Sequence, residues 1–199
     1  MAGDPTVCLY SRDGNQWDTH YDPGGWFGGK IECNNTSQGY HVVLLKWLEH
    51  YHKSGDILMV SETMDTASVF KKMYPQWNWL TTDLYSTLNG GRPDFELDIC
   101  VPVSHDFHNI FGGILAQGTL EHVYDPVGVM RNLHNMAKVG GVIIVHTHTP
   151  PFVYHPYPRD YYRFHIDWFE DMRRFVPGME LVEIVAYAGV VCAAYIKAE

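Results

Sequence analysis

Histidine and tyrosine side chains gather in one stretch of the sequence. The histidines are His146, His148, His155 and His165, and the tyrosines are Tyr154, Tyr157, Tyr161 and Tyr162. Two histidines separated by one residue on a strand share a face, so His146 and His148 have a spacing that can hold a metal ion. Such side chains more commonly line a substrate pocket, and the chain has no His-Glu-x-x-His motif. We therefore expect a pocket here and no metal.

The elements that must position this stretch alternate along the chain. Apolar runs of strand length predict strands at 57–60, 77–83, 96–100, 110–116 and 142–145. Helical spacing predicts helices from Ser37 to about Gly55, over 66–74, from Pro126 to about Lys138, and over 166–175. Asp125 before Pro126 is a specific start signal, with Asp at the N-cap and Pro at the first helical position.

The end of the chain decides the fold class. Two residues, Ala188 and Gly189, separate the runs 181–187 and 190–196, which is too few for a parallel crossover. These runs therefore form an antiparallel hairpin. We expect an α/β fold with a doubly wound, mostly parallel seven-stranded sheet and a C-terminal antiparallel hairpin. Residues 1–36 lack periodicity and are expected to form an irregular cap or arm before a domain at 37–199.

Composition excludes several classes of protein. The chain has 14 Lys and Arg against 23 Asp and Glu, a net charge of −9, and no basic cluster that would bind bulk nucleic acid. The four cysteines form no Cys-x-x-Cys pair. No apolar run reaches the roughly 18 residues that a membrane span needs, and no signal peptide follows Met1. We expect a cytoplasmic protein without a membrane partner, and a homo-oligomer remains open.

Three motifs carry a resemblance to a known family. They are Leu-Glu-His-Val at 120–123 followed by Asp125-Pro126, Lys138 with Gly140-Gly141, and His-Pro-Tyr-Pro-Arg-Asp-Tyr-Tyr-Arg-Phe at 155–164. Over residues 40–196 the chain resembles the class I S-adenosylmethionine (SAM)-dependent methyltransferases. The resemblance implies a Rossmann-like methyltransferase fold with SAM at the carboxyl ends of the strands.

The resemblance also implies which residues contact the cofactor. Asp83, ending the second strand, would accept hydrogen bonds from both ribose hydroxyls, and Asp98 would bind the adenine amino group. Each also has a purely structural interpretation, as a turn residue. The implied cofactor contacts are Ser61, Glu62, Thr63, Asp83, Leu84, Asp98, Ile99, Gln117 and Gly118.

The first strand and its turn depart from the family pattern. Met59 replaces the usual acid, and Ser61, Thr63 and Asp65 replace three glycines that allow close backbone approach. The Asp65 carboxylate would lie near the carboxylate of the cofactor, which is unfavourable. Side chains of Ser61, Glu62 and Thr63 could instead hydrogen-bond an amino group. Either the chain binds SAM through an altered loop, or it keeps only the scaffold.

A methyltransferase must align its acceptor and remove a proton. Imidazole titrates near neutral pH, so His122, beside the expected methyl donor, is the first candidate base, followed by His148 and His155. His122 also has a structural interpretation as a loop residue. The substrate-binding candidates are Tyr157, Arg159, Tyr161 and Arg163.

Three hypotheses of function follow. The favoured one is a SAM-dependent methyltransferase acting on a small-molecule or glycan-type acceptor. The alternative is a catalytically silent methyltransferase-like binding module that has lost normal SAM binding. A metal-dependent enzyme that uses the histidine cluster is the third, and only composition supports it.

Overall fold

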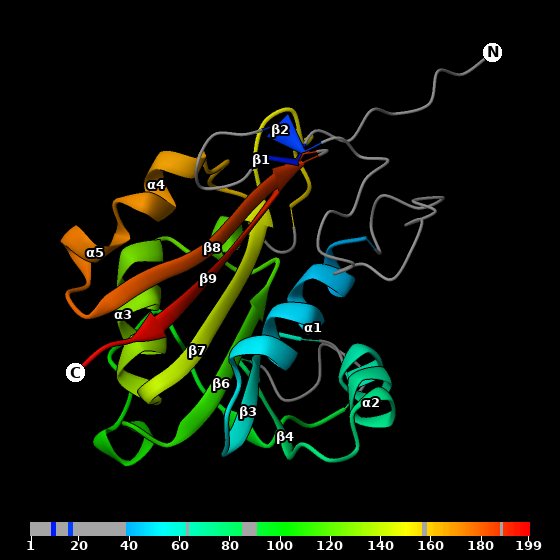
Figure 1. Cartoon of the computed structure of the whole chain (residues 1–199), viewed down its shortest axis with the longest axis vertical. Coiled ribbons are helices and arrows are strands. Elements are labelled where there is room, and N and C mark those ends of the chain that lie inside the picture. Colours follow the sequence, from blue (N-terminus) through cyan, green and yellow to red (C-terminus); the bar gives the residue numbers. More distant parts are fainter. Residues whose placement is uncertain are drawn as a thin grey trace.

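The computed structural model in Figure 1 describes most of the chain after residue 38. The described residues are 9–10, 16–17, 39–62, 64–84, 91–156, 159–187 and 189–199. The expected cap at 1–36 lies outside them, apart from two short strands, β1 (Leu9–Tyr10) and β2 (Gln16–Trp17), which pair antiparallel. Strand β1 also contacts β8 of the main sheet. None of the described helices is long and apolar enough to span a membrane.

A seven-stranded sheet forms the centre of the fold, with the order β5-β4-β3-β6-β7-β9-β8. Its pairs are parallel from β5 to β7, and β9 runs antiparallel to both of its neighbours. The expected fold class is therefore confirmed, including the C-terminal hairpin. The strands are β3 (Asp56–Val60), β4 (Trp79–Asp83), β5 (Phe95–Glu96), β6 (Phe111–Gln117), β7 (Ala137–His148), β8 (Met179–Tyr187) and β9 (Val190–Lys197).

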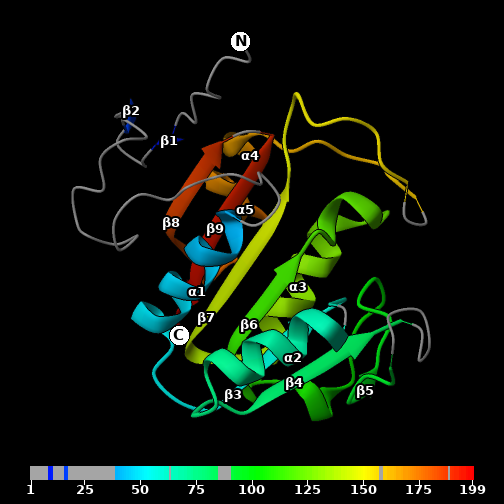
Figure 2. The ribbon, with the colours of Figure 1, turned by 90° about the vertical axis from the view of Figure 1, so that its right-hand side faces the viewer.

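Helices cover both faces of this sheet, as Figures 1 and 2 show. On one face α3 (Pro126–Met136), α4 (Ile166–Glu170) and α5 (Met172–Phe175) pack on one apolar cluster. On the other face α1 (Gly39–Tyr51) and α2 (Met64–Met73) pack on a second cluster. Because both faces are covered, central strands such as β6 are buried along their whole length, which explains their unbroken apolar sequence.

The start of α3 is the one predicted from the sequence. Asp125 caps the helix by accepting a hydrogen bond of 2.9 Å from the N–H of Gly128, and Pro126 is its first residue. The helix ends at Met136, before the expected end at Lys138. The carbonyls of Asn135 and Met136 accept hydrogen bonds from residues 109 and 110 instead, which draws the chain into the sheet, so β7 begins at Ala137.

Two further elements differ in form from the expectation. The strand expected at 96–100 is only Phe95–Glu96, because the Asp98 carboxylate accepts a 2.8 Å hydrogen bond from the N–H of Cys100 and closes a turn. The side-chain amide of Asn132 binds the carbonyl of Ile99 at 2.8 Å and stabilises that turn. The helix expected at 166–175 is divided at Asp171 into α4 and α5.

Gly112, in β6, lies against the backbone of the loop before β3. A side-chain carbon at this position would lie 1.7 Å from the backbone oxygen of Ser54. Only glycine allows the loop before β3 to approach β6 so closely.

Candidate functional site

The candidate site lies at the carboxyl ends of the parallel strands. Strand β3 is flanked by β4 on one side and β6 on the other, so the order of the strands reverses at this point. Such a reversal opens a crevice beyond the strand ends, where open α/β sheets bind their ligands. Four predicted cofactor residues stand there: Ser61 and Glu62 follow β3, Asp83 ends β4, and Gln117 ends β6.

Ser61 adopts an unusual backbone conformation in the turn after β3. Its φ is +54°, in the left-handed region that favours glycine, and its N–H donates a 2.8 Å hydrogen bond to the carbonyl of Thr82. The left-handed conformation costs a residue other than glycine about 1–2 kcal/mol. The turn thus keeps a path suited to glycine although the glycine is gone. Thr63 and the side chain of Asp65 lie outside the described residues.

Glu62 and Gln117 join the ends of β3 and β6. The Gln117 amide donates a hydrogen bond of 2.5 Å to the Glu62 carboxylate. Gln117 is buried, and its amide oxygen has no hydrogen-bond partner in the part of the chain that the structure describes. The Glu62 carboxylate and the amide oxygen of Gln117 both accept hydrogen bonds, so together they fit an ammonium group such as the amino group of SAM.

The ends of β4 and β5 bring the two expected acids to neighbouring strands. The N–H of Leu97 donates a 3.0 Å hydrogen bond to the backbone oxygen of Asp83, which fixes the β5 end beside it. Asp98 follows two residues after β5 and closes the turn described above. Ile99 is buried in the core, while Leu84 is exposed. Gly118, after β6, has a positive φ of +55°.

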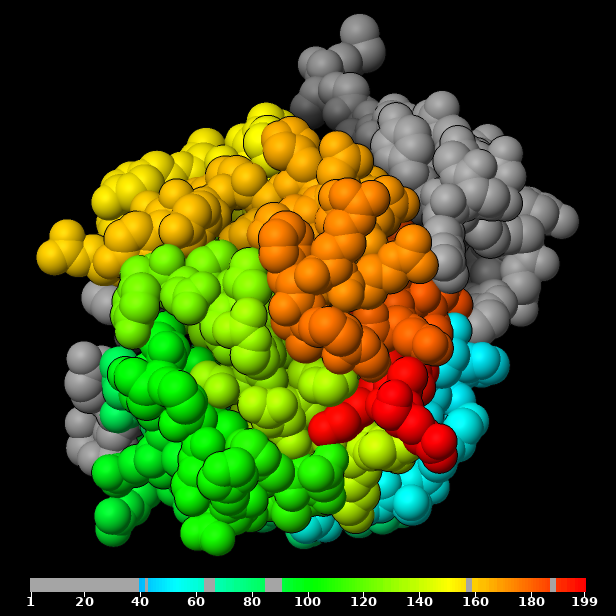
Figure 3. All heavy atoms as spheres, turned by 90° about the vertical axis from the view of Figure 1, so that its left-hand side faces the viewer, coloured from blue at the N-terminus to red at the C-terminus, as the bar shows by residue number. Residues whose placement is uncertain are grey.

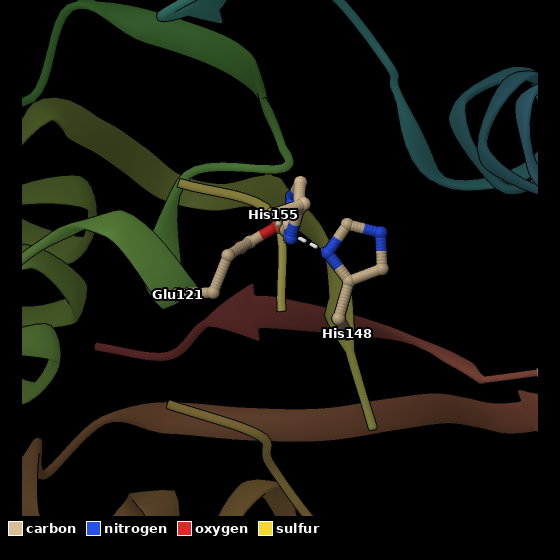
Figure 4. Close-up of side chains that lie close together, drawn as sticks. All are labelled: Glu121, His148 and His155. Atoms are coloured by element: carbon tan, nitrogen blue, oxygen red, sulfur yellow. Dashed lines mark hydrogen bonds and ion pairs between the residues drawn. The ribbon is translucent and has the colours of Figure 1, made fainter. Parts of the chain in front are cut away.

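A buried carboxylate, Glu121, lies at the centre of a histidine cluster. Its side chain is fully buried, accepts a hydrogen bond of 2.5 Å from the Thr147 hydroxyl, and lies 2.6 Å from Nδ1 of His148 (Figure 4). Burial alone would raise the pKa of Glu121, but the hydrogen bonds from His148 and Thr147 outweigh it and hold this pKa below its ordinary value. The carboxylate is therefore ionised at neutral pH.

The other two predicted catalytic histidines face the same carboxylate. His122 Nε2 and His155 Nε2 each lie 3.9 Å from Glu121 Oε1. His122 also contacts the backbone oxygen of Arg159 through Nδ1, and the ring of His148 stacks on Phe152 with 3.6 Å between centroids. Sequence reasoning grouped the three histidines as candidates but missed Glu121. Its place in the Leu-Glu-His-Val motif was visible, whereas its burial was not.

Three of the predicted substrate residues, Arg159, Tyr161 and Arg163, lie on the loop after β7, which covers the upper edge of the molecule beside α4 and α5 in Figure 3. Arg163 is held by Asp160 through two contacts of 2.5 Å, and it donates to the backbone oxygens of Phe152 and Val153. The hydrogen bonds from Arg163 hold the pKa of Asp160 far below its usual range. Arg163 thus orders the loop, a role that sequence reasoning did not assign.

The remaining substrate candidates differ in position. Tyr161 and Arg159 are exposed on the same loop, and the backbone N–H of Tyr161 donates a 2.7 Å hydrogen bond to the backbone oxygen of Glu121. Tyr157 lies outside the described residues. The loop therefore joins the exposed aromatic residues to the buried carboxylate.

His146, paired with His148 in the sequence prediction, lies in a different environment. It is buried, and its ring stacks on Tyr40 at 3.7 Å between centroids. Burial lowers its pKa to about 3, so the ring is neutral at physiological pH. Among the described residues, no group hydrogen-bonds to either of its ring nitrogens.

Neither a protein-family model nor a curated protein sequence matches the chain, but solved structures do. The CurJ carbon methyltransferase is 12% identical with a TM-score of 0.59, and the match covers 80% of this chain and 53% of that one. The methyltransferase domain of the citrinin polyketide synthase is 14% identical with a TM-score of 0.62, over 81% and 52%. This chain thus spans about half the length of these two structures.

A third structure is matched over most of its length. It is a Burkholderia thailandensis 1,6-didemethyltoxoflavin-N1-methyltransferase with bound 1,6-didemethyltoxoflavin and S-adenosylhomocysteine. It is 11% identical with a TM-score of 0.62, over 82% of this chain and 80% of that one. At such identities the likeness establishes the fold.

Proposed function

We propose that this chain, which has the fold of the class I SAM-dependent methyltransferases, transfers a methyl group to a nucleophilic atom of a small-molecule acceptor. SAM supplies the electrophilic methyl group when it is bound. The observation that carries the proposal is the buried, ionised Glu121 bonded to His148 beside the crevice at the strand ends. This pair provides a place for the proton that the acceptor must lose.

The residues at the strand ends support SAM as the cofactor. The oxygens of Glu62 and Gln117 fit an amino group, and the left-handed turn at Ser61 keeps the backbone path of a glycine turn. Asp83 and Asp98 would bind the ribose and the adenine, on neighbouring strand ends. Thr63, Leu84, Ile99 and Gly118 complete the proposed contacts.

His148 and Glu121 form the proposed acid–base pair. When Nδ1 of His148 donates to the Glu121 carboxylate, Nε2 is left with a lone pair that accepts a proton from the hydroxyl or amine of the acceptor. The negative charge of Glu121 then stabilises the imidazolium that forms. His122 and His155 lie near the same oxygen, 3.9 Å away, where they would orient the acceptor.

The loop after β7 would form the acceptor wall. Tyr161 is exposed beside the cluster, and the Phe152 ring lies on His148. Aromatic faces of this kind suit a flat or ring-shaped acceptor better than a charged one. The matched structure with bound 1,6-didemethyltoxoflavin favours a small molecule over a glycan.

A catalytically silent ligand-binding module is the second candidate. The observation that favours it is the positive φ of Ser61, in a turn that suits glycine. The Ser61 side chain adds bulk where a cofactor would approach. Such a module would keep the crevice without transferring methyl groups.

Calorimetry with SAM and S-adenosylhomocysteine tests the proposal. We expect binding at micromolar concentrations, and we expect Asp83→Asn to weaken it at least tenfold because the ribose loses a charged acceptor. Glu170→Gln is the matched control, since it removes one exposed carboxylate on α4, which contacts β8 at the opposite edge of the sheet from β4 and β5. Absence of binding by the wild type at millimolar ligand would exclude the cofactor, and binding without methyl transfer to any acceptor would favour the silent module.

A further inference from the structure

One group of side chains has the ligand atoms of a metal site in addition to its proposed role in proton transfer. Glu121, His148 and His155 each present one ligand atom, and these atoms all lie within 4.8 Å of one another (Figure 4). Glu121 is fully buried and His148 nearly so, whereas the His155 side chain is 33% exposed. The cluster is therefore mostly buried, and its most exposed member is His155.

The distance between His155 and Glu121 suits a shared ion better than a hydrogen bond. His155 Nε2 lies 3.9 Å from Glu121 Oε1, which is too long for a hydrogen bond. Nitrogen and oxygen ligands that each lie about 2.0–2.2 Å from one zinc-type ion are roughly 3–4 Å apart. The shorter contact of 2.6 Å between Glu121 and His148 is a hydrogen bond, and an ion would replace its proton.

Neighbouring groups orient two of the three ligands as in metal sites. His155 Nδ1 lies 3.4 Å from the Asp160 carboxylate, which leaves Nε2 facing Glu121. The second oxygen of Glu121 is held by Thr147 at 2.5 Å. In metal sites, a carboxylate that contacts the second nitrogen of a ligand histidine fixes the orientation of the ring, as Asp160 does for His155. A hydroxyl bonded to a ligand carboxylate does the same, as Thr147 does for Glu121, and both increase metal affinity.

We propose that Glu121, His148 and His155 bind a divalent transition-metal ion of the zinc type. Imidazole and carboxylate suit such ions, and three protein ligands leave a position open, as in catalytic sites. The sequence pattern paired His146 with His148 and predicted a pocket without a metal, and Glu121 was not part of that prediction. On binding, the ion takes the place of the proton on His148 Nδ1, and the neutral ring then carries its one proton on Nε2.

The open position has a role that rests on the proposed methyl transfer. A hydroxyl of the acceptor that ligates the ion becomes more acidic, its O–H bond breaks, and the proton passes to a nearby base. His122 Nε2, 3.9 Å from Glu121 Oε1, does not ligate the ion and serves as this base. With the ion bound, His148 serves as a ligand. The acceptor class is then an alcohol, phenol or enol.

Titration of metal-free protein with Co²⁺ tests the site without SAM or an acceptor. We expect one ion per chain, with the visible absorption bands of a four- or five-coordinate site, and displacement of that ion by Zn²⁺. His155→Ala should weaken Co²⁺ binding at least tenfold. Because the side chain is partly exposed, we expect the variant to keep its fold, which circular dichroism checks. The double variant His105→Ala, His108→Ala is the control, since this pair, exposed at His105 and half-buried at His108, precedes the amino end of β6 and its rings lie 4.6 Å apart.

Each outcome decides the proposal. Equal Co²⁺ affinity in His155→Ala and in the wild type, loss of binding in the control, or no binding below millimolar Co²⁺ would overturn the metal site. If metal binding fails while S-adenosylhomocysteine still binds, the proposed function stands with His148 as the base. If metal binds while SAM and S-adenosylhomocysteine do not, the metal site stands and the methyl transfer fails.

Discussion

Replacing Asp160 by Asn tests how the loop after β7 is held over the site. Asp160 is almost fully buried, makes two contacts of 2.5 Å with Arg163, and accepts a 2.7 Å hydrogen bond from the N–H of His155. Asn keeps the shape but removes the charge. It also presents an N–H₂ group to the Arg163 guanidinium, which has no acceptor for it.

The expected loss of stability follows from these contacts. Hydrogen bonds to charged groups contribute about 1.5–3 kcal/mol each. Because Arg163 keeps 18% of its side chain exposed, water replaces part of what is lost, and we expect a net loss of about 2–3 kcal/mol. For a chain of this size, that lowers the melting temperature by about 4–12 °C.

Thermal unfolding followed by circular dichroism measures the effect, and Asp171→Asn is the control. Asp171 and Arg174 have the same spacing and an ion pair of 3.1 Å, but both are exposed. Such a pair contributes about 0–1 kcal/mol. Similar shifts in the two variants, or no shift in Asp160→Asn, would refute the inference that this pair orders the loop.

The pH dependence gives a second measure of the same contact. Hydrogen bonds from Arg163 hold the pKa of Asp160 far below its usual range. Its contribution is therefore complete above the unfolded carboxyl pKa of about 3.9 and is lost as the pH falls toward the folded pKa. The advantage of the wild type over Asp160→Asn should be constant near neutral pH and shrink below about pH 4.

Three further predictions address the site. Glu121→Gln should lower kcat for methyl transfer by about 10²–10⁴-fold with little change in S-adenosylhomocysteine affinity, and an unchanged kcat would remove Glu121 from the mechanism. Ser61→Gly should raise SAM affinity several-fold in calorimetry, because glycine adopts the positive φ without strain and adds no side chain. Weaker binding would instead indicate that the Ser61 hydroxyl contacts the cofactor directly. His146 should show no titration between pH 5 and 8 by NMR, because burial lowers its pKa to about 3, and a midpoint in that range would contradict its burial.

The fold could be predicted because its signals are local. Unbroken apolar runs marked the central strands, Asp125-Pro126 marked a helix start, and the two residues between the last runs required a hairpin. The errors occurred where distant contacts decide the structure. The side chain of Asn132 holds the turn that shortened β5, and pairing with Phe111 started β7 before the glycines.

The site was predicted in part for the same reason. His122, His148 and His155 were chosen by type and by place after strands, and they meet at one carboxylate. Glu121 was missed because a sequence does not reveal which acid is buried. Arg163 was expected to face a substrate, whereas its pairing with Asp160, three residues earlier, is visible only when the loop is folded.

A crystal structure of the chain grown with saturating S-adenosylhomocysteine tests the central claim most directly. We expect density for the adenosine between Asp83 and Asp98, with the amino group of the ligand against Glu62 and Gln117. Density elsewhere on the molecule, or an empty crevice at a concentration that saturates binding in solution, would contradict it.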